Sequence, residues 1–231
     1  DAICKDIALK QFGPKAGPLV FKAWQSLERA HAILSNNCTW PPLQWPIWYS
    51  GKGYIPTPEE FAKNGVGLGL KPKQAGPITY NPPSLAAQLQ GVSDAWRQAY
   101  PHYADAVDYM NRALAKADDK PLFYRYWWSG EGSPSRKEHI RRQQIYMQSI
   151  GLMGREIGIH FGLQAICEQS KGDPEKYRRE ASALLAEDIK ACKAVADYFE
   201  LLRNAKDLRY DHGFVEKYRK KASGIEKHLG S

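Results

Sequence analysis

Apolar side chains recur at every third or fourth position between residues 84 and 117, and this periodicity constrains the fold more than any other feature of the chain. Such a spacing places the side chains on one face of an α-helix. The stripe continues through Pro101, so we expect one helix of about 50 Å that is kinked near this proline. Its members are Leu85, Leu89, Val92, Trp96, Ala99, Tyr103, Ala106, Met110, Ala113 and Ala117.

Similar spacings predict helices along most of the remaining sequence. They are expected over 1–12, from Pro14 onward, from about Pro134 to Ser170, from about Asp173 to Ala205, and after Gly213. The helix that begins near Asp173 is expected to turn inward Tyr177, Ala181, Leu184, Ile189, Cys192, Val195, Phe199 and Leu202. The sequence therefore predicts an all-α fold, a helical bundle of about five to six helices that forms a single domain over residues 1–231.

Two segments, 36–83 and 120–134, are rich in proline, glycine and aromatic residues, and we expect long loops there. A short extended piece is expected at Phe123–Trp127 within the second loop. A connection as long as 36–83 is uncommon in a compact domain unless it is functional or packed down by its own side chains. Two interpretations of the loop tryptophans stay open, because such rings can bind sugar faces or anchor a loop to the bundle.

The charge balance favours anionic partners. Lys and Arg number 33 against 25 Asp and Glu, which gives a net charge of +8. Basic residues are mixed with acids on the helices and form no arginine-rich arm, so we do not expect a nucleic-acid partner, and no apolar run is long enough to predict a membrane span. The expected ligand is carbohydrate, in particular acidic polysaccharide, and its expected contacts are Trp45, Trp48, Tyr49, Lys52, Lys63, Arg125, Trp127 and Trp128.

Catalytic candidates are few. Glycoside hydrolysis normally needs two fixed carboxyl groups. Glu131 is the best single candidate because it follows two tryptophans, but its flanking glycines are typical of a solvated loop. Asp211 and His212 precede Gly213 and suit a helix N-terminus as well as a general base. No spacing typical of metal ligands or of a phosphate loop is present, so we expect no metal and no cofactor.

Glycines and cysteines give two further expectations. Gly151, Gly154, Gly158 and Gly162 share one helical face, which favours close approach of a neighbouring helix; the alternative is room for a ligand beside His160. The cysteines are Cys4, Cys38, Cys167 and Cys192, and all of them are expected to be small buried hydrophobic residues. Cys167 and Cys192 should lie about 20 Å apart along an antiparallel helix pair, which is too far for a disulfide.

Three stretches resemble the C-terminal helical region of large bacterial glycoside-hydrolase-like proteins. They are CKDIALKQFGPKAGPLVFKAWQSLERA at 4–30, WPIWYSG at 45–51 and RYDHGFVEKYRKK at 209–221. In those proteins a (β/α)₈ barrel, related to that of hexosaminidases and α-glucuronidases, precedes the helical region. The resemblance implies that the catalytic carboxylates belong to a barrel outside this chain, and that the protein is periplasmic or secreted. No catalytic residue of the family can be carried over.

The expected function is therefore that of a non-catalytic accessory domain, which packs on a catalytic domain of the same parent chain and contacts glycan. Two alternatives remain. A stand-alone helical glycosidase or lyase would use Glu131 with Asp211 or His212, and would require these groups to converge in one cleft. A protein–protein interaction module would instead show a contiguous apolar surface.

Overall fold

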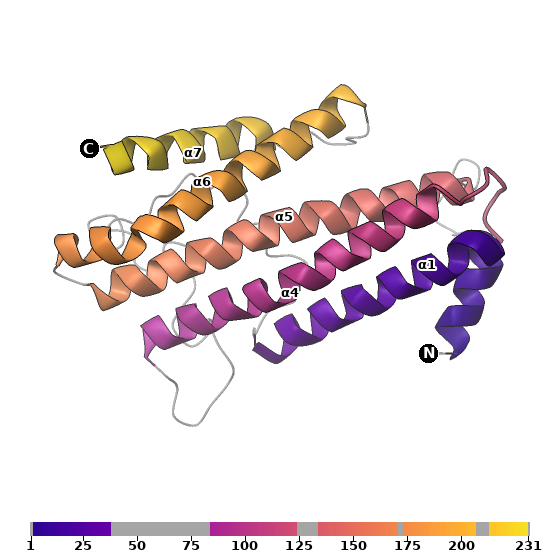
Figure 1. The fold of residues 1–231 in the computed structure, drawn as a ribbon, viewed down its shortest axis with the longest axis horizontal. Coiled ribbons are helices and arrows are strands. Elements are labelled where there is room, and N and C mark those ends of the chain that lie inside the picture. Colours follow the sequence, from indigo (N-terminus) through magenta and orange to yellow (C-terminus); the bar gives the residue numbers. More distant parts are fainter. Residues whose placement is uncertain (1, 38–83, 124–133, 171–172, 207–212, 231) are drawn as a thin grey trace. The chain divides into compact units, whose positions relative to one another are not determined.

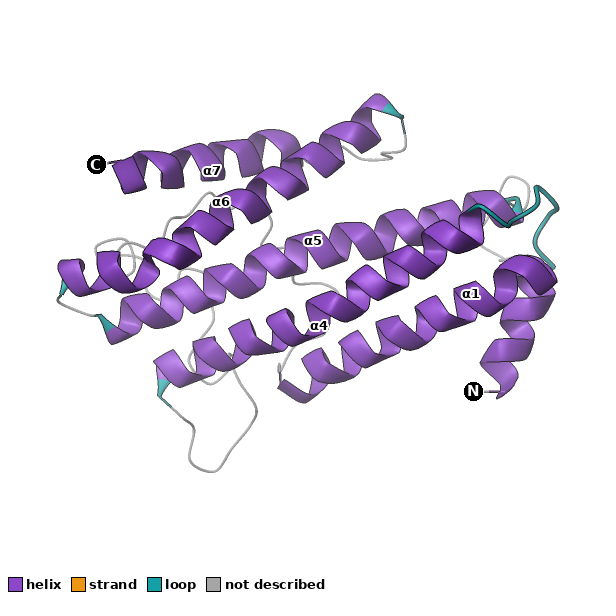
Figure 2. Ribbon diagram, viewed as in Figure 1, coloured by secondary structure: helices purple, strands orange, loops and turns teal. Residues whose placement is uncertain are grey.

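The structure, a computed structural model, describes residues 2–37, 84–123, 134–170, 173–206 and 213–230. Helices make up 90% of this part of the chain, which confirms the all-α prediction. Within these ranges no strand forms (Figure 2), and a single isolated bridge joins Pro121 to Ser135. Five helices are described, labelled in Figure 1: α1 (Ala2–Asn37), α4 (Leu85–Leu114), α5 (Arg136–Gln169), α6 (Pro174–Asn204) and α7 (Phe214–Gly230).

The chain divides into two compact units. Unit 1 comprises Asp1–His31 and Pro101–Gly151, and unit 2 comprises Ala32–Tyr100 and Leu152–Ser231. The borders fall inside α1, α4 and α5, so each of these helices contributes to both units. The expectation of one domain over the whole chain stays a prediction.

Unit 1 is built on an apolar core from α1, α4 and α5. At the edge of this core, Trp24 Nε1 donates a hydrogen bond of 3.0 Å to Gln143 Oε1. A side chain at Gly151 would lie 3.0 Å from Tyr103 Cβ, so this glycine permits close packing against α4. The fully buried residues of the core are Phe12, Ala16, Leu19, Val20, Ala23, Ala106, Met110, Ala113, Leu122, Ile140 and Met147.

The expected helix break at Gly13 is present inside α1. Gly13 has φ 79° and ψ 172°, a conformation that a residue with a side chain rarely adopts. Pro14 follows and has no backbone N–H to lose, which makes the break less costly. A Cβ at position 13 would also lie 2.8 Å from the Arg136 guanidinium, which pairs with Asp118 at 3.3 Å. Glycine at position 13 therefore accommodates both the positive φ of the backbone and the Arg136 side chain beside it.

The predicted inward stripe of α4 is confirmed from Leu89 to Ala113, where every predicted member is buried. The stripe predicted for α6 is partly wrong. Leu184 and Ile189 are only partly buried, whereas Leu185 and Asp188 are fully buried. The physical reason is that α6 packs against residues of both α5 and α7, which widens its buried face beyond a single stripe.

Helices α6 and α7 form an antiparallel pair, and in Figure 1 they lie side by side. Ion pairs on the exposed side of this pair fix its register: Lys193 with Glu226 at 2.7 Å, Glu200 with Arg219, and Arg203 with Glu216 at 2.9 Å. From one ion pair to the next, residue numbers rise by 7 and then 3 along α6 and fall by 7 and then 3 along α7, as in an antiparallel pair. In the interior, the rings of Phe199 and Phe214 lie 4.7 Å apart.

Two smaller expectations can be compared with the described residues. None of the described helices combines the length and apolar character that a bilayer span requires. Cys167 and Cys192 are buried and do not form a disulfide, as predicted. The expectation that Cys4 is buried is wrong: it is exposed in the first turn of α1, where the helix end leaves its side chain in solvent. Cys38 lies outside the described residues.

Candidate functional site

The residues singled out from the sequence for ligand contact and catalysis lie outside the part of the chain that the structure describes. This applies to both aromatic segments and to the residues just before α7, so their arrangement stays a prediction, as does the extended piece expected within 123–127. The residues concerned are Trp45, Trp48, Tyr49, Lys52, Lys63, Arg125, Trp127, Trp128, Glu131, Asp211 and His212.

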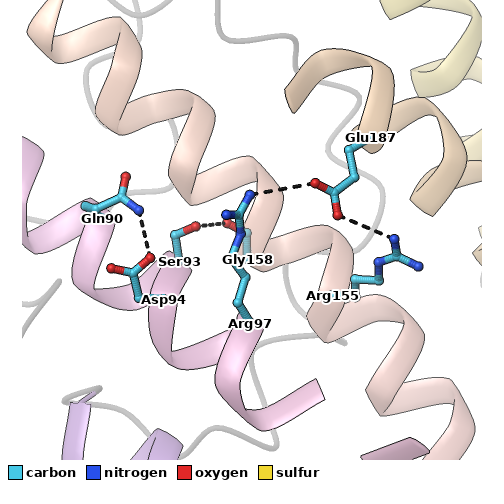
Figure 3. Close-up of polar contacts among 7 residues, drawn as sticks. All are labelled: Gln90, Ser93, Asp94, Arg97, Arg155, Gly158 and Glu187. Atoms are coloured by element: carbon cyan, nitrogen blue, oxygen red, sulfur yellow. Dashed lines mark hydrogen bonds and ion pairs between the residues drawn. The ribbon is translucent and has the colours of Figure 1, made fainter. Parts of the chain in front are cut away.

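Within unit 2, the glycine face of α5 receives side chains of α4. A Cβ on Gly154 would lie 2.1 Å from the Trp96 ring, and one on Gly158 would lie 2.8 Å from Trp96 Cβ. At Gly162 the nearest atom is Ser93 Oγ, at 2.9 Å. Ser93 Oγ also donates a buried hydrogen bond of 2.6 Å to the Gly158 carbonyl (Figure 3). The glycines therefore permit close helix packing, and side chains of α4 fill the space beside them.

Deeper in unit 2, three charged side chains form a buried cluster. Lys221 of α7 forms an ion pair with Glu156 of α5, and its Nζ lies 3.0 Å from Asp188 Oδ2 of α6. The three side chains are exposed by only 3%, 6% and 0%, in that order, so bulk water does not screen them. One ammonium thus connects three helices. We refer to Lys221, Glu156 and Asp188 as the buried triad.

Electrostatics in the buried triad follow from this burial. Desolvation alone would lower the pKa of Lys221, but the carboxylates of Asp188 and Glu156 outweigh it and raise that pKa well above its usual range. Desolvation raises the pKa of Glu156, and Lys221 opposes this shift without cancelling it. Lys221 therefore stays an ammonium at neutral pH and supplies the positive charge of the cluster.

Two further groups lie next to the buried triad. Cys192 Sγ contacts Asp188 Oδ1 at 3.6 Å, and burial raises the pKa of its thiol, which keeps it protonated. Burial lowers the pKa of His160 well below its usual range, and Lys221 lowers it further, so the imidazole is neutral. His160 Nε2 lies 3.2 Å from Gln164 Nε2. These groups give the cluster one cation and no nucleophile in its reactive form.

Metal binding is the first chemistry to consider for such a group. Single ligand atoms of Glu156, Asp188 and Cys192 lie within 4.8 Å of one another. However, the Lys221 ammonium already lies against both carboxylates, so it occupies the position that a metal ion would take and compensates one of the two negative charges. The donor set therefore fits an internal ammonium better than a divalent cation. The arrangement is that of a structural connection between helices.

Sequence reasoning missed the buried triad, although one signal was present. Asp188 lies four residues before Cys192 and therefore on the predicted inward face of α6. Glu156 lies two residues from both Gly154 and Gly158 and therefore on the opposite side of α5 from the glycine face. The carboxylate on the inward face of α6 by itself calls for a buried cation. The sequence alone does not indicate which lysine supplies it.

A second charged group lies on the surface of unit 2, one residue away from the triad on two helices. Arg97 of α4 and Arg155 of α5 both extend toward Glu187 of α6 (Figure 3). The nearest nitrogen–oxygen distances are 3.7 Å for Arg97 and 3.4 Å for Arg155. The Arg155 guanidinium also lies over the Tyr100 ring, 5.3 Å from its centroid. We refer to Arg97, Tyr100, Arg155 and Glu187 as the arginine cluster.

Both groups of charges depend on the helix contacts described above. Arg97 follows Trp96, and Arg155 follows Gly154, so the two arginines flank the point where Trp96 packs on the glycine face. Glu187 precedes Asp188, which Lys221 holds. The exposed arginine cluster is therefore positioned by buried contacts of α4, α5 and α6.

Comparisons with known proteins give no identity. Neither a protein-family model, nor a curated protein, nor a solved structure matches this chain. The resemblance to the helical region of glycoside-hydrolase-like proteins therefore stays a prediction.

Proposed function

We propose that this chain is a non-catalytic helical accessory domain of a carbohydrate-active protein. It packs on a catalytic domain of the same parent chain and contacts acidic glycan through the tryptophans of its two aromatic segments. The net charge of +8 supports an anionic ligand, because it raises the local concentration of negatively charged partners.

One observation carries the non-catalytic part of the proposal. In the buried triad of the described helices, Lys221 is paired with both Glu156 and Asp188, and none of the three side chains is more than 6% exposed. A catalytic acid or base must reach substrate, whereas these groups are enclosed by three helices and bind one another. Their ion pairs therefore connect α5, α6 and α7 and leave none of these groups to act on a substrate.

A test of the proposal combines turnover and binding on the full chain. We expect no hydrolysis of aryl glycosides or polysaccharides. Titration with uronic-acid oligosaccharides should show weak binding that weakens further at high salt, because exposed charge contacts are screened. Trp48→Ala and Trp128→Ala should each reduce this binding, and neutral oligosaccharides should bind less well.

Two outcomes would point to the alternatives. Turnover that disappears in Glu131→Gln would identify a stand-alone glycosidase or lyase and overturn the accessory role. Affinity that is absent, or unchanged in both tryptophan variants, would mean that these rings anchor loops or bind protein. The accessory role also predicts that the parent reading frame encodes a catalytic barrel next to this chain.

A further inference from the structure

We infer that Arg97, Tyr100 and Arg155 form a binding subsite for the carboxylate of an acidic sugar residue, and that Glu187 occupies its anion position when ligand is absent. This inference rests on the proposed function and assigns it a site on the described helices. The subsite differs from the aromatic segments in its place, because its arginines lie on helices α4 and α5.

The positive charge of the subsite comes from two helices. Arg97 and Tyr100 lie three residues apart and therefore on one face of α4, while Arg155 reaches the same place from α5. Guanidinium groups bind carboxylates through two parallel N–H donors, which gives them geometric selectivity for planar anions. Two guanidiniums that converge on one carboxylate leave one positive charge in excess.

Buried contacts fix the helix positions that carry the two arginines, and an aromatic ring restrains one of the two guanidiniums. Ser93 Oγ binds the Gly158 carbonyl at 2.6 Å, and Trp96 fills the space beside Gly154, so α4 and α5 are fixed at this level. The Tyr100 ring under Arg155 restricts that guanidinium further, at 5.3 Å from ring centroid to Cζ. Tyr100 is therefore a positioning residue. Less side-chain freedom is lost when ligand binds to a group that is already ordered.

Glu187 is a replaceable occupant. Its distances of 3.4 Å and 3.7 Å to the two arginines exceed the ~2.7–2.9 Å of a strong charge-assisted hydrogen bond. Its side chain is 40% exposed, so solvent competes for the same contacts. Nearby, Asp94 accepts a hydrogen bond of 2.8 Å from Gln90 (Figure 3). Because the contacts of Glu187 are long and exposed to solvent, an incoming carboxylate can take its place at little cost.

The test removes the internal competitor without removing the arginines. Glu187→Gln should bind oligogalacturonate more tightly than the unmodified chain by up to about fivefold, the factor expected for one exposed ion pair. Arg155→Gln and Arg97→Gln should weaken binding by a similar factor. Glu226→Gln is the matched control, because it makes the same change in net charge at the exposed Lys193–Glu226 pair. Its affinity should stay close to that of the unmodified chain.

Three ligands, measured by isothermal titration at low and high salt, separate the possible outcomes. They are oligogalacturonate, a neutral cello-oligosaccharide of the same length, and oligoglutamate of the same length. Equal gains in Glu187→Gln and Glu226→Gln would overturn the inference, because net charge alone would then explain them. Equal binding of oligoglutamate would overturn the sugar as ligand and favour an acidic peptide.

The inference and the proposed function fail in different ways. Oligogalacturonate binding that is lost in Trp48→Ala, but unchanged in Glu187→Gln and in both arginine variants, would leave the proposed function intact and overturn the subsite. Absence of binding to either glycan in every variant would overturn both. Far-UV circular dichroism and thermal unfolding establish that each variant is folded. Arg97→Gln lies on a different helix from Arg155→Gln, so the test does not depend on one substitution.

Discussion

Helices α5 and α6 are connected twice at the same level, once inside the protein and once at its surface. Inside, Lys221 bridges Glu156 and Asp188; at the surface, Arg155 pairs with Glu187. The residues of the two connections are sequence neighbours, and the charges are of the same types. The two connections differ in burial, so one set of ion pairs fixes the structure while the other remains exchangeable.

Desolvation is the physical reason for this difference. A buried charge has lost its water and depends on its partners, so removal of one partner leaves an uncompensated ion in a medium of low polarity. An exposed pair exchanges partners with solvent at almost no net cost. The buried triad is therefore suited to specifying which faces of α5, α6 and α7 meet, and the arginine cluster is suited to binding. The following experiments test this contrast, beginning with the largest effect.

Lys221→Met should cause the greatest loss of stability. It leaves Glu156 and Asp188 buried without their cation, and breaking such a pair costs about 3–5 kcal/mol of unfolding free energy. Urea denaturation of Lys221→Met and of the unmodified chain measures this loss of unfolding free energy. Lys220→Met, an exposed change at the neighbouring position of α7, should stay within about 0.5 kcal/mol.

A triple variant sharpens the same point. Lys221→Met combined with Glu156→Met and Asp188→Leu removes all three charges, and we expect it to regain most of the stability lost in Lys221→Met. If Lys221→Met alone were as stable as the unmodified chain, the triad would be hydrated. The buried and the exposed ion pairs would then not differ in their contribution to stability.

Gly154→Ala should have the next largest effect. Its Cβ would lie 2.1 Å from the buried Trp96 ring, and overpacking of this kind costs about 1–3 kcal/mol. Gly91→Ala is the matched control in α4, since nothing lies within 4 Å of its Cβ and alanine favours helix by about 1 kcal/mol. The thermal unfolding temperature should fall in Gly154→Ala and rise in Gly91→Ala. A stabilising Gly154→Ala would contradict the close packing described for α4 and α5.

His160 gives the triad region a pH dependence. Its pKa is lowered well below 6.5 in the folded chain, so the unfolded chain takes up the proton first as the pH falls through about 6.5. The unfolding free energy should therefore decrease between about pH 7 and 5 more steeply than in His160→Gln. Glu156, whose pKa is raised, contributes with the opposite sign but is common to both proteins. Parallel pH profiles would show that His160 is protonated equally in both states.

Glu187→Gln should have the smallest effect on stability, below about 1 kcal/mol, because its side chain is 40% exposed and its ion pairs are loose. A double-mutant cycle with Arg155→Gln measures the coupling directly by urea denaturation. A coupling as large as the loss in Lys221→Met would mean that the surface connection is structural, and Glu187 would then not be a replaceable occupant.

The helices can be predicted from local sequence signals alone. The apolar stripe from Leu89 to Ala113 and the boundaries of α5 and α6 are readable from the sequence, because helix periodicity and capping signals such as Asp173 are local. Asp173 Oδ1 accepts a hydrogen bond from the Lys176 backbone at 3.0 Å, as an N-cap does. The glycine face of α5 also predicted close approach of a neighbouring helix.

Which charges meet depends instead on how the helices pack. Glu156, Asp188 and Lys221 are separated by 32 and 33 residues in sequence and come from three helices, so no spacing rule brings them together. The same is true of Arg97, Arg155 and Glu187, whose convergence depends on how closely Trp96 packs against Gly154. Helix formation is a local property of the chain, whereas charge pairing between helices depends on their packing and on the burial that it creates.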